Sequence, residues 1–141
     1  MTTSEQLYEI SDVISDAALA TLRKARADYS AGRINAEEFG VINSEYAQSM
    51  SLATRITGIG IHAAASHLPE LTARVEQSTK AIKQAIARIE HASNALKIIG
   101  SILAFAASIV AAAANPALLA GAVAAGVTLA TTLHDVASSE D

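Results

Sequence analysis

The longest uncharged stretch of this chain limits its fold more than any other feature. It runs from Ile98 to Leu133, so thirty-six consecutive residues carry no acidic, basic or histidine side chain. Asn115-Pro116 divides the stretch into two apolar segments of seventeen residues each. Asn-Pro is a turn signal, and the residue before a proline is disfavoured in the helical region. The sequence therefore predicts an apolar helical hairpin over residues 98–134, with its turn at residues 115–116.

The predicted hairpin meets the requirements for entering a membrane only narrowly. Its strongly apolar residues contribute about −0.3 to −0.6 kcal/mol each, which gives about −2 to −4 kcal/mol per arm. Seventeen residues span about 25 Å, against a hydrocarbon core of about 30 Å. We therefore keep two interpretations, a membrane hairpin and the buried core of a soluble oligomer. For the first, the candidate hairpin residues are Ile99, Leu103, Phe105, Val110, Asn115, Pro116, Leu119, Val123 and Val127.

Small residues recur every four positions in both arms of the predicted hairpin. One row contains Gly100, Ala104, Ser108 and Ala112, and the other contains Ala122, Gly126 and Ala130. Such rows let two helix backbones approach closely in lipid. They also suit an alanine-rich hairpin inside a soluble oligomer, so they predict close helix packing under either interpretation.

Residues 1–97 have the pattern of an amphipathic helical body. They contain all ten Lys and Arg and eleven of the fourteen Asp and Glu, while residues 135–141 form a predicted acidic tail. Apolar residues at spacings of three and four predict a first helix over residues 4–30. Thr3 with Gln6 is its candidate capping box, and Gly32 is its stop signal.

A second helix is predicted to begin at Asn35, which has Glu38 three positions later, as in a capping box. We expect this helix to fray or kink near Gly58 and Gly60 and to end before Pro69.

A seven-residue apolar repeat predicts one long third helix. The repeat runs unbroken from the charged body into the uncharged stretch, and a continuous helix over residues 69–114 would span about 69 Å. Small companion positions make this a narrow, closely packed seam rather than a strong leucine zipper. The helix-packing seam within the body consists of Leu68, Val75, Ile82, Ile89 and Leu96.

Four basic residues lie just upstream of the hairpin and have two interpretations. They are Lys80, Lys83, Arg88 and Lys97. They form an ordinary solvated helix face, or they face anionic lipid headgroups at the base of the hairpin.

Motifs for chemistry are missing from the sequence. There is no cysteine, the four histidines have no metal-ligand spacing, and no serine lies in a nucleophile motif. We therefore expect no enzyme, no cofactor and no metal site. No basic cluster points to nucleic acid.

The apolar hairpin near the end of an amphipathic helical chain resembles the pore-forming colicins and related α-helical pore formers. The stretch SILAFAASIVAAAANPALLAGAVAAGVTLATTL carries this resemblance, which covers about a quarter of the chain. The resemblance implies that the hairpin enters a membrane while the amphipathic helices follow or oligomerise. The chain is shorter than a ten-helix colicin pore domain, and we expect its body to be too small to cover the hairpin as a monomer.

The sequence thus predicts an all-α protein with two N-terminal amphipathic helices, one long helix and an Ala/Gly-rich apolar hairpin. The leading functional prediction is a membrane-inserting oligomer that permeabilises or anchors to a membrane, such as a toxin component, a holin-like protein or a translocator. Its expected partners are membrane lipid and further copies of itself or another helical subunit. The alternative is a soluble structural or adaptor bundle in the cytoplasm. Because the first residues have no signal-peptide pattern, export before insertion would need a route without one.

Overall fold

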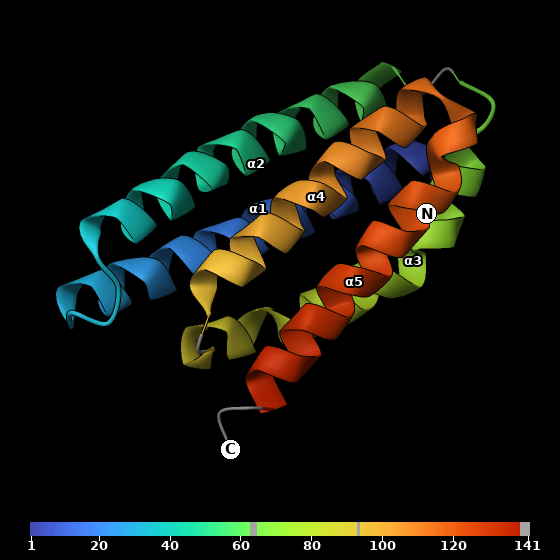
Figure 1. Ribbon diagram of the computed structural model, residues 1–141. Coiled ribbons are helices and arrows are strands. Elements are labelled where there is room, and N and C mark those ends of the chain that lie inside the picture. Colours follow the sequence, from blue (N-terminus) through green and yellow to red (C-terminus); the bar gives the residue numbers. More distant parts are fainter. Residues whose placement is uncertain (63–64, 93, 139–141) are drawn as a thin grey trace.

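Five α-helices follow one another in residues 1–62, 65–92 and 94–138, the part of the chain that this computed structural model describes (Figure 1). They are α1 (Thr3–Ser30), α2 (Ala36–His62), α3 (Leu68–Ala85), α4 (Ala95–Ala114) and α5 (Leu119–Ser138). Two short 3-10 helices join them, η1 (Ile86–His91) before α4 and η2 (Pro116–Leu118) before α5. These residues contain no strand, so the predicted all-α class with its apolar C-terminal helix pair is confirmed.

Helix α1 begins one residue earlier than predicted because its capping box uses a different pair. The Thr2 hydroxyl accepts from the Glu5 backbone N–H at 3.1 Å, and the Glu5 carboxylate accepts from the Thr2 N–H at 3.3 Å. The prediction of Thr3 with Gln6 was therefore wrong by one position. Gly32 follows the helix with a φ of 75°, a conformation that glycine adopts without strain.

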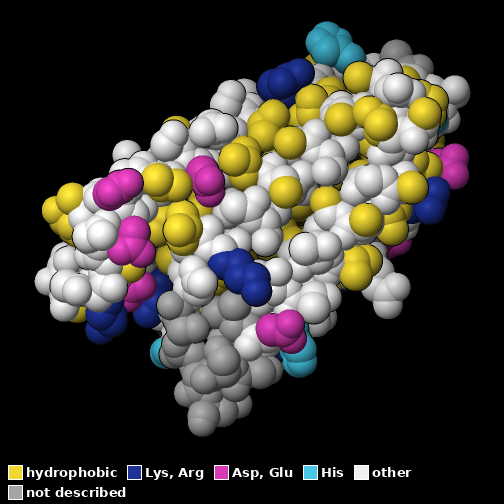
Figure 2. All heavy atoms as spheres, viewed as in Figure 1, with side chains coloured by type: hydrophobic (Ala, Val, Ile, Leu, Met, Phe, Trp, Pro, Cys, Tyr) yellow, Lys and Arg dark blue, Asp and Glu magenta, His cyan; other side chains and the backbone are white. Residues whose placement is uncertain are grey.

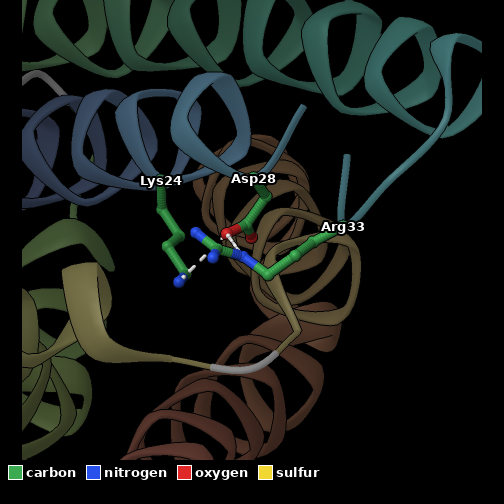
Figure 3. A network of polar contacts seen from close by, with 3 residues as sticks. All are labelled: Lys24, Asp28 and Arg33. Carbon is green, nitrogen blue, oxygen red and sulfur yellow. Dashed lines mark hydrogen bonds and ion pairs between the residues drawn. The ribbon is translucent and has the colours of Figure 1, made fainter. Parts of the chain in front are cut away.

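A buried ion network fixes the loop between α1 and α2 (Figure 3). The carboxylate of Asp28, whose side chain is only 7% exposed, accepts from Lys24 at 3.1 Å and from Arg33 at 2.9 Å. The Arg33 backbone N–H also donates to the Asp28 carbonyl at 2.8 Å. These bonds tie the residue after Gly32 back onto the last turn of α1.

Helix α2 begins at the predicted cap and continues through the predicted weak point. The Asn35 side chain accepts from the Glu38 N–H at 2.8 Å, and Glu38 accepts from the Asn35 N–H at 3.3 Å. The expected fraying at Gly58 and Gly60 was wrong, since α2 stays helical to His62. A Cβ at Gly60 would lie 3.3 Å from the Cβ of Leu7, so this glycine lets α1 and α2 pack closely.

The predicted continuous helix over residues 69–114 is two helices that are separated by a turn. Helix α3 ends at Ala85, η1 follows, and the chain then reaches an extended conformation at Ala92. The Asn94 side chain accepts from the Lys97 N–H at 3.0 Å and caps the start of α4. Because of this break, α4 folds back along the bundle instead of extending it (Figure 1).

Helix α4 lies in the middle of the bundle and packs against α1, α2 and α5. Its buried face is built from large apolar side chains with no exposed surface, namely Ile98, Ile99, Ile102, Phe105 and Ile109. Helices α1 and α2, of 28 and 27 residues, are long enough to cover it. The expectation that a single chain cannot cover this arm was therefore wrong.

The hydroxyl groups of the bundle make two kinds of hydrogen bond. Some donate to the carbonyl four residues earlier in the same helix, as Thr21, Thr79 and Ser108 do at 2.7 to 2.8 Å. Others join α1 to α2, since the Ser11 hydroxyl donates to the Ala53 carbonyl at 2.8 Å and accepts from the Thr57 hydroxyl at 2.8 Å.

Candidate functional site

The apolar hairpin predicted from the sequence is present as α4, η2 and α5. The Asn115 backbone N–H donates to the Ala111 carbonyl at 2.9 Å and closes α4. The Asn115 side chain then accepts from the Ala117 N–H at 3.0 Å and starts η2 at Pro116. The turn is exposed, and it lies at the same end of the bundle as the N-terminus of α1 (Figure 1).

The boundaries of the hairpin differ slightly from the predicted domain limits. Helix α4 begins at Ala95 rather than at residue 98. Helix α5 continues to Ser138, so residues 135–138 of the predicted acidic tail are helical. The rest of that tail, residues 139–141, lies outside the described residues.

Both arms are long and apolar enough to cross a membrane by length and composition. The spans are Ala95–Ala114, with a mean hydropathy of 2.1, and Pro116–Asp135, with a mean hydropathy of 1.7. Within these windows, 44% and 33% of the residues are buried in the bundle. More than half of each arm is therefore at least partly accessible while the hairpin is packed.

The predicted membrane residues are distributed over different sides of the hairpin. Those packed into the core are Ile99, Phe105 and Leu119, those half-buried are Leu103, Val110 and Val123, and those exposed are Asn115, Pro116 and Val127. The most apolar face of the hairpin thus points toward the body. The accessible remainder is uncharged and rich in alanine, as the view over α4 and α5 shows (Figure 2).

Gly126 marks the closest approach of α5 to the rest of the bundle. A Cβ on Gly126 would lie 3.0 Å from the Cβ of Ser78 on α3 and 3.1 Å from Cε1 of Phe105 on α4. The row of small residues on α5 is buried or half-buried with it. The corresponding row on α4 begins at the surface, because Gly100 and Ala104 line an open groove.

The predicted packing seam is an internal feature of the monomer along most of its length. Leu68, Val75, Ile82 and Ile89 are buried in the core. Leu96 follows the break between η1 and α4 and is 38% exposed. The seam therefore joins helices within one chain, and a role between chains stays a prediction.

The four candidate headgroup-facing residues are exposed but belong to different surroundings. Lys80 pairs with Glu76 at 3.2 Å, and Lys83 lies 4.0 Å from Glu9 on α1. Arg88 lies on η1. Lys97 lines the groove between α2, α4 and α5. Contact with lipid headgroups stays a prediction for this set.

That groove also contains a buried acid. The Glu45 oxygen Oε2 is shielded from solvent and has no hydrogen-bond partner among the described residues. Lys97 lines the same groove, so a change in its rotamer would supply a charged partner for this carboxylate.

Sequence reasoning missed the role of His67, which holds the end of α4. The His67 Nε2 atom lies 3.0 Å from the Ala112 carbonyl and 2.9 Å from the Ala113 carbonyl. Because carbonyl oxygens only accept, Nε2 must carry the proton. The partners are 45 and 46 residues away in sequence, so no local pattern signals the contact.

An open cavity of 530 Å³ lies beside this contact, between α2 and α4. Its walls are mainly apolar, and Arg55 and His62 stand on its α2 side. Within the described ranges, no group of three or more His, Asp or Glu side chains converges as a metal site would require.

Comparison with known proteins leaves this description to stand by itself, since no family model, no curated protein and no solved structure matches the chain.

Proposed function

We propose that this protein is a membrane-inserting helical protein that carries its hairpin packed in a bundle and releases it into lipid. The observation behind the proposal is the charge-free hairpin with an exposed, uncharged turn at one end of the molecule. The nearest ionisable groups in sequence, Lys97 and His134, lie at the opposite ends of α4 and α5 from the turn. The turn therefore enters a bilayer first without carrying a charge with it.

The packing of the hairpin supports release as a unit. Helix α4 is held mainly by apolar side chains, and its contact surface with lipid would be of the same chemical kind. Transfer of apolar surface from a protein core to a hydrocarbon core costs little, whereas its transfer to water costs about 25 cal/mol per Å². Lipid can thus replace the body as the covering of the hairpin.

Permeabilisation would need several copies, because two helices do not enclose a water-filled pore. The uncharged, alanine-rich surface of α4 and α5 offers close packing between inserted hairpins. We therefore extend the proposal to a homo-oligomer formed in the membrane, with a toxin component, a holin-like protein or a translocator as the classes it fits. Reaching a foreign membrane would require export without a signal peptide.

Release of the hairpin is tested by locking it to the body. The Gly126 and Ser78 sites are close enough for a disulfide after a small outward shift, and the chain has no native cysteine. The double variant Ser78→Cys/Gly126→Cys pins α5 to α3. A matched control, Ser11→Cys/Thr57→Cys, replaces two hydroxyls that lie 2.8 Å apart and pins α1 to α2.

Dye release from liposomes is the measurement for both pairs, before and after reduction. We expect the oxidised α3–α5 lock to suppress release and reduction to restore it, while the control pair releases dye in both states. Equal release by the oxidised and reduced α3–α5 pair would contradict the proposal, because the hairpin would then act without leaving the body.

A second test places a polarity-sensitive dye on the turn through Ala117→Cys. This position is exposed, and it preserves the Asn115 side chain that caps η2. Insertion predicts that the dye becomes accessible to quenchers in the acyl chains or inside the vesicle. An unchanged dye spectrum in a folded protein would leave the second candidate function, a soluble structural or adaptor bundle.

The burial of the large side chains of α4 within one chain favours that second candidate, since the core is already covered without lipid.

A further inference from the structure

The cavity between α2 and α4 has the size and lining of a ligand site. Its 530 Å³ lies within the range of about 300–1,000 Å³ that small-molecule pockets occupy. Apolar side chains from both helices and from the start of α3 form most of the wall. The larger residues of the lining are Ile59, Leu68 and Val110, and small residues, Gly58 and Ala113 among them, leave the space open.

One unpaired cation stands at this otherwise apolar cavity. Arg55 is exposed, and among the described residues no carboxylate lies within ion-pair distance of its guanidinium. The basic groups Lys24 and Lys80 of the body, in contrast, contact acids at 3.1 and 3.2 Å. A guanidinium matches the geometry of a phosphate or carboxylate, so the cavity fits an anion that carries an apolar chain.

His67 removes an obstacle to an anion at this place. The end of α4 would present unsatisfied carbonyls and the negative pole of the helix dipole to the cavity. The His67 Nε2–H group donates to the carbonyls of Ala112 and Ala113, at 3.0 and 2.9 Å. Two of the acceptors that would repel an anion are therefore already occupied.

We propose that this cavity binds an anionic membrane phospholipid, with the phosphate on Arg55 and one acyl chain against Ile59 and Val110. The cavity lies at the end of α4, next to the turn that would enter the bilayer first. Binding there would orient the bundle with its turn toward an anionic membrane. This role rests on the proposed function, whereas the binding itself is measurable in water without any bilayer.

The test titrates the full-length protein with lysophosphatidylglycerol below its critical micelle concentration, by isothermal titration calorimetry. Lysophosphatidylcholine provides the same chain without net charge, and glycerol phosphate provides the anion without a chain. Circular dichroism during the titration checks that the helices stay folded. We expect binding of lysophosphatidylglycerol, weaker binding of lysophosphatidylcholine and none of glycerol phosphate.

Two variants and one matched control locate the site. Gly58→Leu fills the cavity from α2, where an added Cβ meets nothing within 4 Å, and leucine suits a helix better than glycine. Gly40→Leu makes the same change in the same helix, also with nothing within 4 Å, away from the cavity. We expect Gly58→Leu to weaken binding about tenfold or more, and Gly40→Leu to leave it within about twofold. Arg55→Gln should remove the preference for the anionic lipid.

Two results would overturn the proposal. Equal affinity of the wild type and Gly58→Leu for lysophosphatidylglycerol would place the lipid elsewhere. Equal affinity of the wild type for both lysolipids, unchanged by Arg55→Gln, would refute the role of the anion. The proposed function fails separately: the protein would then bind lysophosphatidylglycerol normally and still release no dye from liposomes.

Discussion

Replacing Gly126 by alanine should destabilise the bundle even though alanine favours helix. The new Cβ would lie 3.0 Å from the Cβ of Ser78, 3.1 Å from its hydroxyl and 3.1 Å from the Phe105 ring. The Ser78 Cβ is attached directly to the α3 backbone, so α5 has to move outward. Overpacking of this kind costs about 1–3 kcal/mol, and the gain in helix propensity returns about 0.5–1 kcal/mol. The net loss in the free energy of unfolding is about 0.5–2 kcal/mol.

Gly121→Ala in the same helix is the matched control. Nothing lies within 4 Å of a Cβ at Gly121, so only the propensity gain of about 0.5–1 kcal/mol applies. The two variants should therefore shift stability in opposite directions. Urea unfolding followed by far-UV circular dichroism measures both, and a gap of about 2 kcal/mol separates their midpoints by about 1 M at a slope of about 2 kcal/mol/M.

A double variant checks that the contact with Ser78 is the cause. Ser78→Gly/Gly126→Ala moves the Cβ from α3 to α5 and should recover most of the loss caused by Gly126→Ala alone. If Gly126→Ala is as stable as Gly121→Ala, the close approach of α5 to α3 does not exist in solution. The hairpin would then not be packed against the body as described.

Three further substitutions probe other parts of the bundle. Asp28→Asn removes the charge that Lys24 and Arg33 share, and thermal melting should show a loss of about 1–3 kcal/mol, whereas unchanged stability would mean that the loop is held without the network. Ile89→Asp buries an unpaired carboxylate at a cost of several kcal/mol and should abolish cooperative melting; the same change at the exposed Leu96 should cost much less, and equal effects would contradict the burial of the seam. His67→Ala frees two carbonyls at the end of α4 and should speed amide exchange there, with His67→Gln partly restoring protection, while unchanged exchange would exclude this contact in solution.

Local signals in the sequence predicted the fold where a single residue type determines the backbone. Gly32, the pair Asn35 and Glu38, and Asn115-Pro116 all lie at helix ends, as predicted. Each of these signals acts within about four residues, through a φ angle, a missing N–H or a side chain that caps the backbone. Such interactions do not depend on the rest of the molecule.

The break between α3 and α4 was missed because the seven-residue repeat continues across it. Ile89 and Leu96 fit the repeat equally well, yet the first is buried and the second is exposed. In a segment so rich in apolar residues, a repeat can continue by composition alone. Asn94, which is a favoured N-cap residue, was the available sign of a new helix.

The features of the candidate sites depend on contacts between distant residues. The approach of Gly126 to Ser78, the bonds from His67 to α4 and the cavity beside Arg55 each join segments that are far apart in sequence. Periodicity identifies which residues share a helix face. It contains no information on which other helix that face meets, so the sequence predicted the hairpin but not its covering.

The two kinds of hydroxyl bond imply an order in which the bundle can come apart. The hydroxyl of Ser108 donates to the Ala104 carbonyl of its own helix, so α4 takes this bond along into any new surroundings. The bonds of Ser11 with Ala53 and Thr57 would instead break if α1 separated from α2, which would leave polar groups without partners. The first line of separation therefore runs between the hairpin and the α1–α2 pair, and that pair moves as one piece.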